Sequence, residues 1–284
     1  MPQSESEWAN AFPWSLSYRW GHSALAVDFD LSGDTARLVR VRRPGDPEEV
    51  EADVLLPLVD AVLLGEGSGR SRPPFTGSVL GERLRYRAHR STLEAEGGAG
   101  VRWHRLVVEL RDPESGVAAF VEFASPDGVC VLRSRVRLCN EGDAPVTVRS
   151  LGSLLLGGLP SPAELMVSQG RDEWLAECPW SADGRFTMGA LRCRTDARTW
   201  LWQIESASSG VGEAGEAAGR TYLALGGPAP GERQGGEVLE PGAEFASGWV
   251  ALALGTGFDG ALAELTAYRR VRVGGGFSRS SPRP

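Results

Sequence analysis

The chain has 284 residues, and its 37 acidic residues against 30 basic ones, all of them arginine, give a net charge of −7. This acidic excess disfavours a DNA or RNA partner, because nucleic-acid phosphates attract surplus positive charge. No apolar run has the length of a bilayer, and the polar N-terminus MPQSESEWAN lacks the basic and apolar regions of a signal peptide. We therefore expect a cytoplasmic protein with no membrane partner.

Alternation of apolar and polar residues predicts many short strands. They fall at residues 24–29, 36–42, 106–110, 117–123, 130–138, 145–156, 199–204, 222–225 and 248–254. Turn residues such as Pro-Asp-Gly at 126–128 separate them. This pattern favours an all-β protein, a large antiparallel β-sandwich, over alternating strands and helices.

The run 130–138 is the clearest of these strands. One face is apolar and the other carries three arginines, so we expect the first to point into the core and the second outward. The two sets are Leu132, Val136 and Leu138 against Arg133, Arg135 and Arg137. Cys130 and Cys139 would lie roughly 30 Å apart along this strand, too far for a disulfide. With no C-x-x-C spacing, we expect the four cysteines to be reduced.

One helix is predicted near the end of the sequence, at residues 259–270. Asp259 is its expected N-cap, Phe258, Leu262 and Leu265 form its apolar side, and two arginines suit its C-terminus. The Gly-, Ala- and Glu-rich stretch 206–220 indicates a long mobile loop. We thus expect an N-terminal extension (1–20), a β-sandwich domain (21–257), a linker helix (258–271) and a disordered tail (272–284).

The usual catalytic motifs are missing from the sequence. Without lysine there is neither a phosphate-binding P-loop nor a Schiff-base residue, and no glycine pattern indicates a dinucleotide cofactor. His22, His89 and His104 have no partner at metal-ligand spacing, so we expect surface or core histidines rather than a metal site. We expect no cofactor. The acids Asp172, Glu173 and Glu177 surround a tryptophan, but their pattern is typical of a solvated loop.

The nine tryptophans divide into two classes. Trp200 and Trp202 lie on the same face of one expected strand with Leu201 on the other, a pattern typical of a strand buried on both faces. Trp174 and Trp180 lie among charges, prolines and glycines, which predicts loop positions. Loop aromatics are the better candidates for contact with a ligand or partner.

An ordered set of segments resembles the N-terminal domain of actinobacterial α-galactosidases of glycoside hydrolase family 36. These are LPLVDAVLLGEGSGRSRPPFTGSVLGERLRYRAHR (56–90), VELRDPESGV (108–117), SPDGVCVLRSRVRLCNEGDAPV (125–146), DEWLAECPW (172–180), WLWQIE (200–205) and LTAYRR (265–270). The resemblance runs from about residue 20 to residue 270. It departs from the family between residues 180 and 199, which is shorter here, and after WLWQIE, where a Gly/Ala/Glu stretch follows.

The resemblance implies a β-supersandwich that a helix joins to a (β/α)₈ barrel holding both catalytic aspartates. The matching part of this sequence stops where such a barrel would begin, so we assign no catalytic residue and expect the chain alone to be inactive. Candidate substrate-binding residues, by motif position on the rim of a neighbouring active site, are Arg72, His89 and Trp174. Each also has a structural alternative: a loop tether, a strand-end hydrogen bond and a loop plug.

Three functional classes remain open. The chain is the non-catalytic domain of an α-galactosidase-type enzyme, a stand-alone carbohydrate-binding module, or an interaction domain that complements a separately encoded barrel. The implied partners are accordingly a galactoside, a second copy of the chain or that barrel. A self-sufficient glycosidase would need two aligned carboxylates, for which the sequence offers no visible source.

Overall fold

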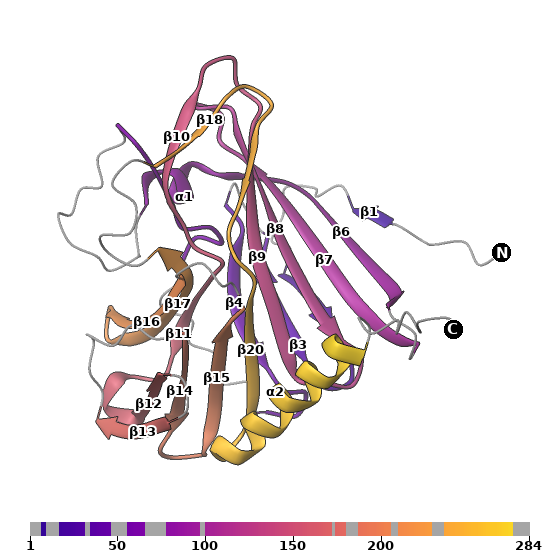
Figure 1. Ribbon diagram of the computed structural model, residues 1–284, viewed down its shortest axis with the longest axis vertical. Helices are drawn as coiled ribbons and strands as arrows, with labels where there is room; N and C mark the ends of the chain where they lie inside the picture. The colour runs from indigo at the N-terminus through magenta and orange to yellow at the C-terminus, as the bar shows by residue number, and fades with distance from the viewer. Residues whose placement is uncertain are drawn as a thin grey trace, which may run out of the picture.

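The computed structural model describes residues 7–9, 17–31, 35–46, 56–65, 78–96, 100–171, 174–179, 187–205, 210–228 and 236–274. Antiparallel strands dominate these residues, which confirms the expected all-β fold (Figure 1). The helices among them are α1 (Val79–Arg83), a short 3₁₀ turn (Pro162–Glu164) and α2 (Gly257–Gly274).

The largest sheet has 11 strands. In spatial order they are β1 (Glu7–Ala9), β6 (Arg85–Glu96), β7 (Val101–Arg111), β8 (Val117–Pro126), β9 (Val131–Asn140), β20 (Val250–Thr256), β15 (Arg198–Ile204), β14 (Met188–Cys193), β12 (Leu165–Arg171) and β13 (Trp174–Pro179), with β19 (Glu244–Ala246) beside β9. Strands far apart in sequence therefore meet at its centre, where β9 pairs with β20.

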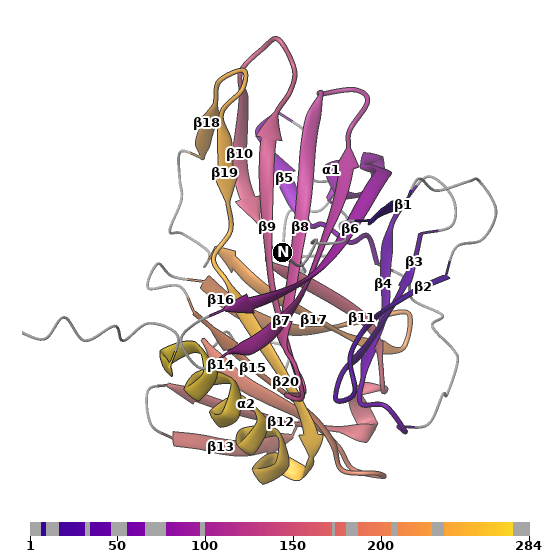
Figure 2. The same cartoon turned by 90° about the vertical axis from the view of Figure 1, so that its right-hand side faces the viewer.

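Three smaller sheets of three strands each complete the fold. They are β2 (Ser17–Gly21), β3 (Ala26–Asp30) and β4 (Arg37–Arg42); β18 (Glu237–Leu239), β10 (Val146–Leu151) and β5 (Ala61–Leu63); and β11 (Leu154–Leu159), β17 (Arg220–Pro228) and β16 (Gly210–Ala217). The main apolar core joins residues of all four sheets. A second core lies under α2, and Figure 2 shows α2 on one side of the large sheet and β2–β4 on the other.

The predicted two-faced character of β9 is confirmed. Its apolar residues are buried in the main core, while its arginines are only half-buried and face carboxylates. The same holds for β15, where Trp200 and Trp202 enter the main core and Leu201 packs in the core under α2. Cys130, Cys139 and Cys193 are free thiols, as expected.

The C-terminal helix is confirmed, with one correction at its start. α2 begins at Gly257, so Asp259 lies in the first turn and is not the N-cap. It still faces the positive end of the helix dipole there. Leu265 is fully buried, and Phe258 and Leu262 pack beside it, so the predicted apolar side is correct.

The expected mobile loop at 206–220 is wrong for its described part, since Gly210–Ala217 forms β16 and pairs with β17. Aromatic packing explains the glycines. A Cβ on Gly212 would lie 2.4 Å from Trp202 Nε1, and one on Gly215 would lie 2.2 Å from the Tyr222 ring. Here the glycines make room for aromatic rings in a sheet, a role that composition alone does not distinguish from a loop.

Two further expectations need correction. The run 145–156 is two strands, β10 and β11, which belong to different sheets. Trp174 does not lie in a loop but is the first residue of β13, where it pairs with Arg171 of β12. Trp180 lies outside the described residues, as does the expected tail from residue 275 onward.

Candidate functional site

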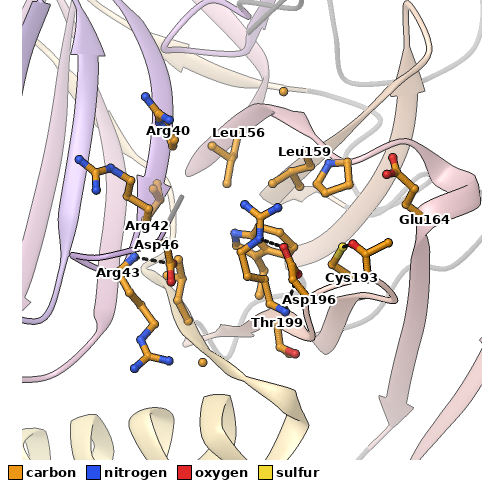
Figure 3. Close-up of a pocket in the computed structure, with 18 of the residues that line it drawn as sticks. Arg40, Arg42, Arg43, Asp46, Leu156, Leu159, Glu164, Cys193, Asp196 and Thr199 are labelled. Carbon is orange, nitrogen blue, oxygen red and sulfur yellow. Dashed lines mark hydrogen bonds and ion pairs between the residues drawn. The ribbon is translucent and has the colours of Figure 1, made fainter. Parts of the chain in front are cut away.

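A cavity lies where β4, β11, β15 and β17 approach one another, and we call it the arginine pocket (Figure 3). Its volume of about 640 Å³ is in the range of small-molecule sites. Residues from Val39 to Asp46 form one side, with Asp196, Thr199 and Cys193 opposite. Two glycines at the bulge of β11, Gly157 and Gly158, add no side chains to the wall.

The floor of the arginine pocket is apolar. Trp200, only 5% exposed, lies there with Val41, Leu156, Leu159 and Leu254, all from the main core. Among the described residues the Trp200 Nε1 hydrogen has no acceptor. An aromatic floor below a polar rim is the usual form of a sugar-binding cavity, because a pyranose has both a C–H face and hydroxyl edges.

Three carboxylates line the pocket, and each is already used by the backbone beside it. Asp46 accepts from the backbone N–H of Arg43 at 3.0 Å, and Asp196 accepts from that of Arg198 at 2.9 Å. Glu164 accepts from both the backbone N–H and the hydroxyl of Ser161. Such side chains hold turns in place.

The charge state of two of these carboxylates follows from the same contacts. Hydrogen bonds from Ser161 lower the pKa of Glu164. Burial opposes ionisation of Asp196, but hydrogen bonds from Arg198 and Cys193 outweigh it and lower the pKa of Asp196. Both groups are therefore ionised at neutral pH and are poor proton donors.

Five arginines also line the pocket. They are Arg40, Arg42, Arg43, Arg198 and Arg220, contributed by β4, the turn after it, β15 and β17. The side chain of Arg198 binds Asp196 and lies 5.8 Å from the Trp200 ring centre. Within the described residues, the hydrogen bond of the Arg43 guanidinium is to the hydroxyl of Thr256, at 3.0 Å.

His89, one of the candidate substrate-binding residues, lies in β6, and its side chain is buried, with 4% exposed. Its ring lies 4.2 Å from that of Tyr18, and its Nδ1 is 2.7 Å from the Tyr86 hydroxyl. Burial lowers the pKa of His89, so the ring is neutral at pH 7. These contacts match the structural alternative, a strand hydrogen bond, while a role toward a ligand stays a prediction.

The structure does not bring Trp174 to His89. Trp174 lies on β13, near one end of the large sheet, whereas His89 lies on β6 near the other end. Trp174 pairs with Arg171 of β12. The acids Asp172 and Glu173 and the side chain of Glu177 are outside the described part of the structure. Arg72 also lies outside the described residues. His89 does not line the arginine pocket.

A Ser–His–His–Asp cluster is not visible in the sequence because its members come from distant parts of the chain: the residue after β2, strands β7 and β8, and the turn after β8. The rings of His22 and His104 are 4.9 Å apart, His22 Nε2 is 2.8 Å from Ser125 Oγ, and His104 Nε2 is 3.3 Å from Asp127. Yet Ser125 is fully buried and donates its proton to the Val131 carbonyl. A nucleophilic serine must instead give its proton to the histidine.

The protonation of His22 follows from its neighbours. Its Nδ1 accepts from the backbone N–H groups of Ala24 and Gly128, so the Nε2 carries the hydrogen and points at Ser125. Burial, with the neighbouring His104, lowers the pKa of His22 to about 4. The cluster is therefore a structural tie between β2, β7 and the turn after β8.

Among the described residues, no group of three His, Cys, Asp or Glu side chains is placed to hold a metal ion. No described helix has both the length and the apolar character needed to span a membrane.

Comparison with known proteins shows similarity only at the level of structure. No protein-family profile and no curated sequence matches the chain. A family 36 α-galactosidase from Geobacillus stearothermophilus, solved with 1-deoxygalactonojirimycin, superposes with a TM-score of 0.68 at 14% identity, over 90% of this chain and 43% of that one. The α-galactosidase from Lactobacillus brevis gives 0.65 at 12% identity, over 90% and 42%.

The chain shares its fold with part of these α-galactosidases. The sequence resemblance to family 36 thus extends to the three-dimensional structure, and the chain spans less than half the length of the enzymes it matches. A putative aldose 1-epimerase from Escherichia coli has a TM-score of 0.52 at 14% identity, over 84% of this chain and 98% of that one. The described residues contain the β-sandwich and no (β/α)₈ barrel.

Proposed function

We propose that this chain is the non-catalytic β-sandwich domain of an α-galactosidase-type glycoside hydrolase. The observation that carries the proposal is the structural match to family 36 enzymes over 90% of this chain but only 43% of theirs. In this role the domain supports assembly with a catalytic barrel and contributes to the rim of its active site. The ligand of that assembly is a galactoside, as in the related complexes with raffinose and stachyose.

The described carboxylates support a non-catalytic role. Retaining hydrolysis needs one ionised carboxylate and one protonated carboxyl group on either side of a sugar. The pocket carboxylates hold turns, and the pKa of Glu164 and of Asp196 is lowered. Burial raises the pKa of Asp60 to about 7, which would suit a proton donor, but the cavity beside Asp60 has a volume of about 10 Å³. That space admits one water molecule and no sugar.

The match to a whole putative aldose 1-epimerase favours a second candidate, a self-sufficient sugar epimerase. Epimerisation at an anomeric carbon requires an acid and a base at the sugar ring. No histidine lines the arginine pocket, and its carboxylates are engaged by the backbone. These contacts favour binding without catalysis, so a stand-alone carbohydrate-binding or protein-interaction sandwich is the alternative to the galactosidase domain.

Among the candidate rim residues, Trp174 has the most suitable position. It is the first residue of β13, the edge strand of the large sheet, and an edge strand is open to contact with a neighbouring domain. His89 is enclosed by two tyrosines, which argues for a supporting role. Arg72 completes the proposed rim on sequence grounds alone.

Activity of the purified chain is the first test. We expect no hydrolysis of an aryl α-galactoside above the no-enzyme background. Turnover that disappears in Asp172→Ala, Glu173→Ala or Glu177→Ala would overturn the non-catalytic assignment, because loss in a point variant excludes a contaminating enzyme.

Genomic context and reconstitution test the other half of the proposal. We expect the DNA after codon 284, or a separate gene, to encode a barrel that co-purifies with this chain. The barrel should be more active with the chain than without it, and Trp174→Ala should reduce that gain. The control Trp249→Ala, which changes the residue before β20, should not reduce it. Absence of any barrel partner, together with galactose binding by the chain alone, would instead support the stand-alone module.

A further inference from the structure

The turn after β8 is held from both sides of the large sheet. From the side of β2–β4, the ring of His22 accepts a hydrogen bond from the backbone N–H of Gly128 at 3.4 Å. From the side of α2, the carboxylate of Glu264 accepts from the backbone N–H of Cys130 at 2.8 Å, and Val129 packs in the core under the helix. Figure 2 shows β2–β4 and α2 on opposite sides of this sheet. The turn therefore connects the β2–β3 hairpin to α2.

His22 makes its contacts only as a neutral ring. Its Nδ1 accepts from the backbone N–H groups of both Ala24 and Gly128, and its Nε2 donates to Ser125 Oγ at 2.8 Å. Ser125 in turn donates to the carbonyl of Val131, which fixes the direction of that bond. An imidazolium has two N–H donors and no acceptor, so a proton on Nδ1 would face two backbone N–H groups. Protonation of His22 must therefore break both contacts of Nδ1.

The charged neighbours of His22 do not offset this loss. The ring of His104 lies 4.9 Å from that of His22 and opposes a positive charge there. Asp127 favours such a charge, but its carboxylate is shared with Arg102 at 2.5 Å and with His104 at 3.3 Å. Burial and His104 together outweigh Asp127 and lower the pKa of His22 from its ordinary 6.5 to about 4. Between these values, a released His22 binds a proton that the held ring does not.

We propose that the contacts of His22 form an acid-sensitive latch, which fastens the turn after β8 to the β2–β3 hairpin and releases it, together with its hydrogen bond to α2, when His22 is protonated. The latch is closed above a pH of about 6.5 and opens as the pH falls toward 4. Between pH 7 and pH 5 the ratio of open to closed turn should rise about 20-fold. The latch requires neither a galactoside nor a catalytic barrel, so it is independent of the proposed function.

Amide hydrogen exchange of the full chain at pH 7 and pH 5 tests the latch. After correction for the intrinsic pH dependence of exchange, the protection of the turn after β8 should fall about 20-fold, because exchange reports the open population. The protection of α2 should fall over the same range, since Glu264 loses its donor at Cys130 when the turn opens. Constant protection of the turn would refute the latch, and a fall that leaves α2 unchanged would refute its connection to the helix.

Two asparagine variants separate the latch from the general effect of acid. His22→Asn places an amide oxygen where Nδ1 accepts its hydrogen bonds and cannot be protonated in this range, so the fall in protection should disappear. His89→Asn is the matched control, because burial also lowers the pKa of His89 but its ring contacts Tyr86 and not the turn. This variant should keep the full fall. The same response in both variants would overturn the proposal.

Titration of the histidine rings by NMR tests the latch in the wild-type chain. We expect the His22 ring to titrate with a pKa of about 4 and to carry its hydrogen on Nε2 at pH 7. Titration near the ordinary 6.5, or a hydrogen on Nδ1 at pH 7, would refute the latch, because neither is compatible with two backbone donors at that atom.

Discussion

Two regions of this molecule are rich in arginine and differ in how the charge is balanced. On the outer face of β9, every arginine has a carboxylate: Arg133 binds Glu205 at 3.0 Å, and Arg135 binds Glu122 at 2.8 Å. Arg137 reaches Glu244 at 2.5 Å. At the arginine pocket, Arg42 shares Asp28 with other arginines and Arg198 binds Asp196, whereas the Arg43 guanidinium donates to the hydroxyl of Thr256.

Aromatic rings sharpen the contrast. Trp249 lies under two arginines of β9: its ring centre is 3.9 Å from the guanidinium carbon of Arg133 and 4.5 Å from that of Arg135. The ring centre of Phe120 is 4.2 Å from the guanidinium carbon of Arg137. The β9 face is thus neutralised, ordered and structural. Arginine count alone therefore predicts no binding site; what matters is whether the protein itself supplies the counter-charge.

The largest expected effect on stability is at Glu205, a buried carboxylate that forms an ion pair with Arg133 on the outer face of β9. Its side chain is 4% exposed and accepts from Arg133, Arg272 and the Tyr268 hydroxyl, so it ties α2 to the sheet. Glu205→Ala leaves a partly buried guanidinium and a buried phenol without their acceptor. We expect the free energy of unfolding in urea to fall by about 3–5 kcal/mol.

The matched control for that variant is Glu244→Ala. Glu244 also binds an arginine of β9, but its side chain is 52% exposed. The loss should stay within about 1 kcal/mol, as for other exposed ion pairs. Similar losses in the two variants would mean that burial does not decide the value of these pairs.

A second large effect concerns Asp60, a buried acid that forms no ion pair with an arginine of the described residues. Burial, with Glu213 nearby, raises the pKa of Asp60 to about 7, although hydrogen bonds from Ser78 oppose the shift. The folded state thus keeps a proton that the unfolded state releases near its ordinary pKa of 3.8. This contribution to stability is complete below that value and is lost as the pH rises through about 7.

Asn cannot lose a proton, so Asp60→Asn avoids this loss. Between pH 5 and pH 8 the free energy of unfolding of the variant should therefore rise relative to that of the wild type, by about 2–4 kcal/mol. Asp112→Asn is the matched control. Asp112 is fully buried too, but Arg83 and Ser115 outweigh the effect of burial and lower the pKa of its carboxyl group. Its loss should destabilise the protein at pH 8. Urea titrations at both pH values measure each difference, and the same sign for both variants would contradict the assignment.

Much of the fold was predictable because alternation reports burial directly. The alternation in β9 predicts correctly which face is buried and which carries the arginines. The apolar run Trp200, Leu201 and Trp202 predicts correctly that β15 is buried on both sides. The β16 strand was missed because its glycines are set by the rings of Trp202 and Tyr222, which come from other strands. Such long-range packing leaves no local signal.

The arginine pocket was not predictable for a related reason. More than a hundred residues of sequence separate Arg43 from Arg198 and Arg220. Only the arrangement of the sheets brings the three arginines to one cavity. The His22–His104 pair is hidden in the same way. Sequence spacing exposes a site only when its residues share one element or one turn.

A smaller effect tests the aromatic half of the β9 face. Trp249→Ala removes the ring below Arg133 and Arg135, and we expect a loss of about 1–2 kcal/mol in the free energy of unfolding. Trp249→Phe keeps a ring and should lose less. If the two variants are equally destabilised, the ring–guanidinium contact is not the source of the effect.

The smallest expected effect is on stability at the pocket, and it has the opposite sign. Arg43 lies beside four other arginines in the pocket lining, and its guanidinium donates to a hydroxyl rather than a carboxylate within the described residues. Arg43→Gln removes one positive charge from this neighbourhood, so at low salt the chain should gain up to about 0.5 kcal/mol. Arg133→Gln, which removes the same charge from the neutralised β9 face, should lose stability because Glu205 then keeps a buried charge with one partner fewer. Urea unfolding of both variants at about 0.05 M salt measures the difference, and added salt should reduce the gain of Arg43→Gln as the repulsion is screened. If Arg43→Gln instead proved as destabilising as Arg133→Gln, the contact of Arg43 with Thr256 would matter as much to stability as a buried ion pair, and the contrast between the two regions would fail.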